Sequence, residues 1–247
     1  MRDIDDYEQV YATAENDFEV YQAMYRKKRV LESLRKVTDQ GVIVEIGCGM
    51  DSIFNYYNEY SKFFCIEPGT KFYKALVSQR KNDSRIVLIN DFFENAISQI
   101  DKEVDCIICS SLLHEIENPY EFLKLIRDIA SSDTLVHINV PNAKSFHRML
   151  AVKSGIINDI HDMSSNNVLL QQRTVFDLDK LQEMIGSVGD IEILECGSYF
   201  PKPFTHKQMK ACLDNGIIER NILEGLYNMG EYMPELGSEI FIDFKWK

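Results

Sequence analysis

Short apolar runs alternate with amphipathic stretches through the middle of the chain. Five runs rich in β-branched and aromatic residues, each followed within two residues by glycine, proline, asparagine or serine, cover residues 42–46, 63–66, 85–89, 104–109 and 134–140. Stretches with apolar residues near a helical period lie between them, at 71–81, 92–100 and 119–130. Because strands that alternate with helices form βαβ units, the pattern predicts an α/β fold with a doubly wound, mostly parallel sheet.

The two ends of the chain depart from this alternation. We predict a helical N-terminal segment, residues 1–40, that packs over a site formed by the main domain, residues 41–247. After residue 150 we expect a helix at 177–188, a sixth strand at 191–194, a capping box at Thr205-x-x-Gln208 that begins a helical stretch, and a final strand at 238–244. Residues 151–173 and 197–237 carry apolar side chains outside this scheme, so we expect helical cap elements that form a lid or a dimer interface.

Composition narrows the class of protein. The 247 residues fit one enlarged domain, and 27 basic against 39 acidic residues give a net charge of −12. An acidic chain repels phosphate backbones, so we expect no nucleic-acid partner. No apolar run approaches the roughly 18 residues of a membrane helix, and the N-terminus lacks the pattern of a signal peptide. We therefore expect a cytoplasmic protein without a membrane partner, in which the six cysteines are free thiols.

Polar residues and glycines follow the first three predicted strands, where ligands bind in parallel sheets. Gly47-x-Gly49 allows a tight turn and a close approach of ligand to backbone. Glu67 ends the second strand, where a carboxylate can bind both hydroxyls of a ribose. Asp91 ends the third strand and can accept a hydrogen bond from an adenine amine, with Phe92 beside the ring. Together these positions predict an adenosine-binding pocket.

Two cofactor classes use such a pocket. A dinucleotide site prefers G-x-G-x-x-G, and Ser52 stands at its third glycine position. A site for S-adenosylmethionine prefers an acidic residue just before the glycines, which Glu45 supplies.

Four segments resemble the class I S-adenosylmethionine-dependent methyltransferases of the small-molecule type. They are Val44–Gly49, Cys65–Pro68, Ile89–Glu94 and Asp105–Ile116. The likeness covers residues 40–145 strongly, and Asp51 stands where the family usually has a third glycine. The resemblance implies a seven-stranded sheet whose last strand is antiparallel and lies between strands five and six. It also implies S-adenosyl-L-methionine as the cofactor.

The resemblance further assigns candidate cofactor contacts. The turn around Gly47 would line the methionine part, Glu67 would hold the ribose, Asp91 and Phe92 the adenine, and Ser110 would face the sulfonium. The cofactor-binding set is Glu45, Gly47, Cys48, Gly49, Glu67, Pro68, Asp91, Phe92 and Ser110. We expect no metal, and the Cys106-x-x-Cys109 spacing is interpreted as part of a core strand.

Candidate acceptor-side residues follow strands four and five. His147 and His114 are the candidate general bases, with His147 preferred, and we expect a rate that rises through an ordinary histidine pKa. Arg148 is a candidate for holding an anionic group. Other candidate substrate contacts are Tyr21 and Tyr25 in the N-terminal helix and His161 and His206 in the variable part. His137, inside strand five, is expected to be structural.

The function that these features favour is transfer of a methyl group to an oxygen or nitrogen of a small molecule, such as a sugar or secondary metabolite. A homodimer is compatible with the apolar insertions. Two alternatives remain at this point. They are a nicotinamide-dependent oxidoreductase on a similar sheet and a non-catalytic cofactor-binding module.

Overall fold

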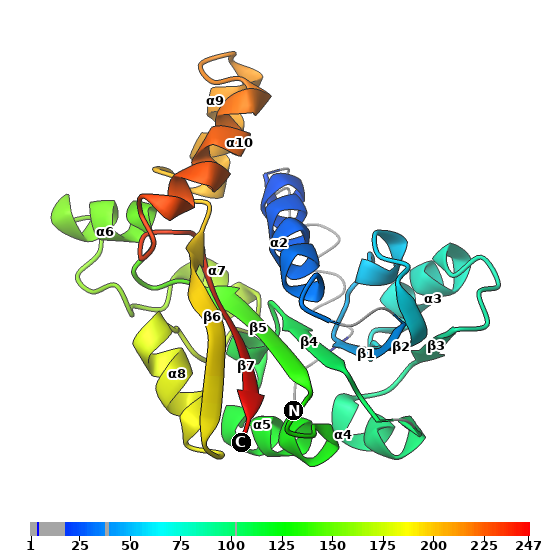
Figure 1. Cartoon of the computed structure of the whole chain (residues 1–247). Helices are drawn as coiled ribbons and strands as arrows, with labels where there is room; N and C mark the ends of the chain where they lie inside the picture. Colours follow the sequence, from blue (N-terminus) through cyan, green and yellow to red (C-terminus); the bar gives the residue numbers. More distant parts are fainter. Residues whose placement is uncertain (1–3, 5–17, 38–39, 102) are drawn as a thin grey trace.

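The computed structural model describes residue 4 and residues 18–37, 40–101 and 103–247. Seven strands form one sheet in the order β3-β2-β1-β4-β5-β7-β6 (Figure 1). β1 to β5 pair in parallel, whereas β7 is antiparallel to both β5 and β6. The strands are β1 (Gly41–Ile46), β2 (Tyr60–Ile66), β3 (Ile86–Ile89), β4 (Cys106–Ser110), β5 (Leu135–Pro141), β6 (Ile191–Tyr199) and β7 (Glu239–Trp246).

This topology confirms the predicted fold class, including the antiparallel last strand between strands five and six. The largest difference concerns β6, which was predicted over 191–194 and extends to Tyr199. Its second half, Glu195–Tyr199, lacks a clear apolar alternation but pairs with β7 from Asp243 to Glu239. Pairing with β7 therefore defines the strand where local sequence does not.

Helices cover both faces of the sheet (Figure 1). On one face, α2 (Glu19–Leu34), the short 3-10 helix η1 (Ile53–Asn55) and α3 (Thr70–Gln79) pack on side chains of the central strands. On the other face, α4 (Phe93–Ala96), α5 (Pro119–Ile129) and α8 (Leu178–Gly186) bury the larger apolar cluster. Cys106 and Cys109 belong to different clusters because residues three apart in a strand face opposite sides, so the CxxC spacing brings no thiols together.

The regions outside the βαβ pattern are mostly helical. Residues 151–173 contain the end of α6 (Phe146–Lys153) and then α7 (Ser165–Leu169). Residues 197–237 contain the end of β6, followed by α9 (His206–Asp214), α10 (Arg220–Asn228) and the 3-10 turn η4 (Met229–Glu231). The predicted capping box is present, since the side chains of Thr205 and Gln208 each bond to the other's backbone N–H.

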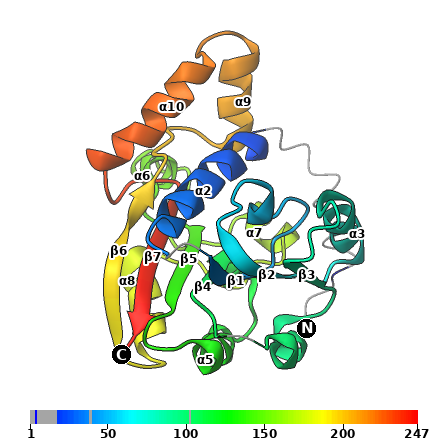
Figure 2. The ribbon, with the colours of Figure 1, turned by 45° about the vertical axis from the view of Figure 1, so that its right-hand side comes forward.

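The hairpin of α9 and α10 stands beyond the end of the sheet and meets the first turns of α2 (Figure 2). An aromatic cluster joins them. The Tyr25 ring stacks on Phe200 at 4.5 Å and on Tyr227 at 5.2 Å, and Phe18 lies beside Phe200 at 6.2 Å. Tyr25 is only 2% exposed and is a core residue that anchors the hairpin, and its predicted contact with substrate stays a prediction.

Among the described residues, no helix is long and apolar enough to cross a membrane. The predicted N-terminal segment, residues 1–40, includes α2, and the part before Phe18 lies largely outside the described residues.

Candidate active site

The turn after β1 presents backbone to a ligand. Gly47 and Gly49 adopt φ angles of 72° and 62°, which glycine tolerates best. A Cβ at Gly47 would lie 2.9 Å from Leu112 Cδ2, so the loop after β4 packs directly on this turn. A Cβ at Gly49 would meet nothing within 4 Å, which leaves an open face beside the backbone. The turn is therefore closed on the Leu112 side and open on the Gly49 side.

Glu67 is fixed by the backbone of two loops. Its Oε2 accepts a hydrogen bond from Gly49 N and its Oε1 accepts one from Gly69 N, both at 2.8 Å. The residue is 5% exposed. Because each carboxylate oxygen has two lone pairs, both can also accept bonds from a ribose diol. Glu67 thus joins the turns after β1 and β2 and remains suited to the predicted role.

Glu45 braces the same loop from below. Its buried carboxylate accepts a hydrogen bond from the Ser52 hydroxyl. Ile53 N donates to both carboxylate oxygens, at 3.2 Å to Oε2 and 3.3 Å to Oε1. Burial raises the pKa of Glu45 to about 7, because the bonds from Ser52 and Ile53 offset only part of the lost hydration. The acidic residue before the glycines therefore holds the start of η1.

The Cys48 side chain points toward β2, with its Sγ 2.8 Å from Cys65 Sγ. Glu45, Cys48 and Cys65 bring a carboxylate and two thiols within 4.8 Å of one another. Burial raises the pKa of both thiols, so both are protonated at neutral pH in this arrangement. Because the Cys48 side chain is directed toward β2, its backbone is the part that can contact a ligand in the turn.

The ends of β3 and β4 complete this side. Asp91 Oδ1 accepts bonds from Phe92 N and Asn95 Nδ2, each at 2.8 Å, which fixes the loop that carries Phe92. Pro68 lies alongside, since its carbonyl accepts a bond from the side chain of Asn90. Ser110 ends β4, and the next residue, Ser111, takes a φ of 55°, an uncommon conformation for a side-chain-bearing residue. The structure thus gathers the predicted cofactor residues along one sheet edge.

A buried polar cluster lies beside this edge, on the face that α2 covers. Ser110 pairs in register with Asn139, whose Nδ2 donates to Glu239 Oε2 at 2.9 Å and to the Tyr199 hydroxyl at 3.2 Å. Arg26 Nε donates to both Glu239 oxygens at 3.0 Å, and Gln22 Nε2 donates to Oε1 at 3.1 Å. The cluster places groups from α2, β5, β6 and β7 beside the predicted sulfonium position.

Lys202, which sequence reasoning missed, lies at the edge of this cluster. It is 2% exposed, and its Nζ lies 3.4 Å from His147 Nδ1. Burial lowers the pKa of Lys202 to about 8. The sequence contains a local signal, Pro201-Lys202-Pro203 directly after β6, but the strand end itself was not recognised.

His147 and His206 meet near Lys202, each in the first turn of its helix, α6 or α9. Burial, with Lys202 nearby, lowers the pKa of His147 to about 2, and the same causes lower that of His206 to about 3. A ring with such a low pKa is a weak general base at neutral pH. The expectation of a rate governed by an ordinary histidine pKa at His147 is therefore corrected.

The remaining predicted acceptor residues lie elsewhere or are occupied. Arg148 donates through Nε and Nη2 to the carbonyls of Ile160 and Asp162, so it orders the turn after α6, and its predicted contact with an anionic group stays a prediction. His161 Nε2 lies 3.2 Å from Asp177 Oδ2 at the start of α8. His114 is buried, and its carbonyl accepts bonds from Arg173 N and Thr174 N, which favours a bracing role.

Tyr21 lines a groove of about 850 Å³ on the outer side of α2. Asp51 and Tyr56 from the β1–β2 connection, and Lys210 and Arg220 from the hairpin, form its other walls. The groove therefore extends from the cofactor turn to the hairpin.

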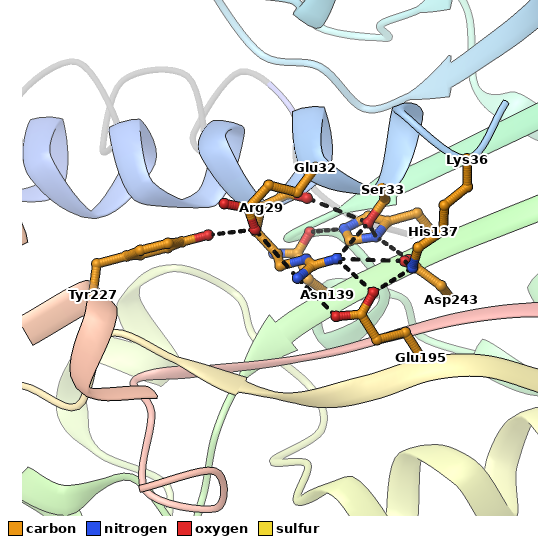
Figure 3. A network of polar contacts seen from close by, with 9 residues as sticks. All are labelled: Arg29, Glu32, Ser33, Lys36, His137, Asn139, Glu195, Tyr227 and Asp243. Atoms are coloured by element: carbon orange, nitrogen blue, oxygen red, sulfur yellow. Dashed lines mark hydrogen bonds and ion pairs between the residues drawn. The ribbon is translucent and has the colours of Figure 1, made fainter. Parts of the chain in front are cut away.

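A charge network anchors α2 to the sheet (Figure 3). Asp243 Oδ1 lies 2.6 Å from His137 Nδ1, and its Oδ2 lies 2.6 Å from Lys36 Nζ. Arg29 bridges Glu195 on β6 at 3.0 Å and approaches Asp243 at 3.7 Å. Burial by itself would raise the pKa of Asp243, but the bonds from His137 and Lys36 hold this pKa well below its usual value. His137 is thus structural in this arrangement, and its Nε2 lies 3.3 Å from Asn139 Oδ1.

Comparisons with known proteins agree with this architecture. A family model described as a methyltransferase domain matches residues 44–138. An S-adenosylmethionine-dependent methyltransferase from Mesorhizobium loti superimposes with a TM-score of 0.59 at 13% identity, covering 89% of this chain and 97% of that one. Another from Thermotoga maritima gives a TM-score of 0.59 at 13% identity and covers 98% of both chains.

Two curated relatives match part of the chain. Thiol S-methyltransferase TMT1B of Rattus norvegicus is 24% identical over 132 residues, 49% of this chain and 54% of the relative. The Mus musculus protein of the same name is 25% identical over 116 residues, 44% of this chain and 48% of the relative. The chain spans about half the length of the curated relatives it matches.

Residues 44–138 therefore match a methyltransferase domain, and the chain has the fold of the solved S-adenosylmethionine-dependent methyltransferases to which it was compared.

Proposed function

We propose that the chain transfers a methyl group from S-adenosylmethionine to a small-molecule nucleophile that needs little help from a base, a thiol or an unprotonated amine. The observation that carries this choice is the environment of His147, which burial and Lys202 make a weak base. Of the acceptor atoms predicted from sequence, nitrogen fits this environment and a hydroxyl oxygen fits it poorly. Sulfur is added because the curated relatives are named thiol S-methyltransferases.

The residues at the strand ends fit the cofactor. The open face at Gly49 and the twice-bonded carboxylate of Glu67 suit a ribose and an amino-acid moiety, and Asp91 and Phe92 suit an adenine. When bound, the cofactor supplies an activated methyl whose bond to the sulfonium sulfur breaks as an acceptor lone pair attacks. The chain's own contribution is to hold the two reactants in line and to exclude water, which can supply several kcal/mol.

The acceptor side is formed by α2, α6 and the α9–α10 hairpin. In this proposal they enclose a small acceptor, because Glu239, Tyr199 and Lys202 beneath them are almost fully buried. Hydrogen exchange of residues 205–229 tests this: cofactor plus acceptor should slow it at constant protein concentration. Protection that follows protein concentration and ignores ligand would instead indicate that the hairpin forms a dimer interface.

Turnover of cofactor with a labelled methyl group tests the acceptor class. Thiophenol, aniline and phenol form a matched set that differs in the nucleophilic atom. We expect methylation of the thiol or the amine and at least a hundredfold slower reaction of the phenol, the loss typical of a missing general base. Rapid methylation of phenol that drops more than tenfold in His147→Ala would overturn the proposal.

A further inference from the structure

The segment after β6 is built to direct Lys202 inward. Phe200, a bulky side chain, takes a φ of 60°, which costs about 1–2 kcal/mol relative to an ordinary backbone conformation. Its carbonyl accepts three hydrogen bonds, from Lys202 N at 2.8 Å, Ser238 N at 3.1 Å and Ser238 Oγ at 2.6 Å. Strained residues persist where surrounding contacts over-determine them, and they cluster at functional sites. The contacts thus fix a lysine that is flanked by two prolines.

The charge on Lys202 has no carboxylate partner in the described part of the chain. Its ammonium lies 3.4 Å from His147 Nδ1, which belongs to a ring that is neutral at physiological pH. The nearest acids, Glu239 and Glu19, are already bound by Arg26, at 2.5 and 3.0 Å. His206 also points to Glu19, at 3.5 Å. A buried ammonium without an anion is costly, so an anionic ligand would stabilise this position.

Two further buried side-chain atoms, one on α2 and one at the start of α6, lack hydrogen-bond partners among the described residues. These atoms are Gln22 Oε1 and Ser145 Oγ. Gln22 binds Glu239 through its other amide atom, and Ser145 precedes His147 at the start of α6 without capping it. The Ser145 hydroxyl can donate to an anion, and Gln22 Oε1 can accept from a proton-bearing group of the same ligand. Together with the ammonium of Lys202, these atoms are buried polar groups whose missing hydrogen bonds a ligand could supply.

We propose that Lys202, Ser145 and the two histidines at the starts of α6 and α9 form a subsite for a carboxylate of the methyl acceptor. The inference rests on the proposed function and adds the substrate class, an acidic small molecule. A carboxylate carries one negative charge, which matches the single ammonium. A phosphate dianion would leave a negative charge uncompensated beside Glu239 and Glu19. Lys202 takes over the role that sequence analysis gave to Arg148.

The test uses two acceptors that differ only in the anion, 4-mercaptobenzoate and 4-mercaptobenzamide. In the wild-type protein, kcat/KM should favour the carboxylate about tenfold or more, the range of a hydrogen bond to a charged group. Lys202→Met should remove this preference, mainly through a rise in KM for the carboxylate. Lys207→Met, on the exposed side of α9, is the matched control and should keep the preference.

Calorimetric titration with benzoate, in protein loaded with S-adenosylhomocysteine, separates binding from turnover. Wild-type protein should bind benzoate, and binding should weaken as the pH rises through about 8, where Lys202 loses its proton. The charged or titratable neighbours are Glu19 and Arg26 on α2, Glu239 on β7, His147 on α6 and His206 on α9. Lys202 has a pKa of about 8, so its loss of a proton should produce this profile.

The outcomes distinguish the two proposals. Benzoate binding that is lost in Lys202→Met, without methylation of either thiol or of aniline, supports the subsite and contradicts the proposed function. Equal methylation of both thiols by wild type and variant supports the function and overturns the subsite. If Lys202→Met fails to fold, Lys202→Gln and the pH profile of wild-type benzoate binding decide, and a profile that is flat from pH 7 to 9 overturns the inference.

Discussion

The cofactor side and the acceptor side of this site are built by different means. On the cofactor side, the groups come from loops that directly follow β1 to β4, and backbone atoms dominate, as at Gly49 and Gly69. On the acceptor side, the groups come from elements that are far apart in sequence, from α2 to β7. Arg26 and Glu239, for example, are separated by 213 positions and meet at 2.5 Å. The first side depends on strand order, whereas the second depends on charges that hold α2 against the sheet.

The difference suggests that the two sides can be uncoupled. A change that loosens α2 should damage acceptor binding and leave much of the cofactor turn in place. A change at Glu67 should do the reverse.

Asp243→Ala should produce the largest loss of stability. It leaves His137, Lys36 and Arg29 without their shared carboxylate, and breaking a buried ion pair typically costs about 3–5 kcal/mol. Urea unfolding measures the loss, and calorimetry at low temperature should still detect cofactor binding by the folded fraction. Asp133→Ala, at an exposed position, is the control. A loss below about 1 kcal/mol would mean that the network does not anchor α2.

Glu67→Ala should weaken cofactor binding about tenfold or more, because it removes a charge-assisted contact to a ribose diol worth about 1.5–3 kcal/mol. The fold should survive, since β2 and its pairing are unchanged. Calorimetric titration with S-adenosylhomocysteine measures the effect, and Glu94→Ala, on the exposed surface of α4, is the control. Unchanged affinity would remove Glu67 from the cofactor site.

Glu45→Gln should change how stability depends on pH. The folded-state pKa of about 7 lies above the usual value, so the folded protein retains a proton that the unfolded chain releases. Glu45 therefore stabilises the fold at low pH, and this contribution is lost as the pH rises toward 7. Relative to wild type, the variant should gain about 2 kcal/mol between pH 5 and pH 8.

Urea unfolding at both pH values, with Glu94→Gln as the control, provides the measurement for Glu45. A constant difference between variant and wild type would show that the carboxylate is already ionised at pH 5 in the folded protein.

Local pattern was sufficient for the cofactor side. Val42–Ile46 followed by Gly47-x-Gly49 predicts a buried strand and a tight turn, and Glu67 and Asp91 follow strands of the same kind. Parallel strands place their carboxyl ends along one edge, so strand order alone brings these residues together. Their roles toward the cofactor stay predictions, but their common location required no long-range information.

The acceptor side was decided by tertiary structure. Nothing near His147 in the sequence indicates that burial lowers its pKa, helped by Lys202 at 3.4 Å. Nothing near Tyr25 indicates that its ring stacks on those of Phe200 and Tyr227. Arg148 is of a residue type that often binds anions, yet its guanidinium donates hydrogen bonds to two backbone carbonyls. The sequence by itself determined the sheet and the edge where ligands bind, because alternation and turn residues act over a few positions. Which charges are buried, paired or left free depends on contacts across the whole chain, and these exist only once α2, the hairpin and β7 have packed together.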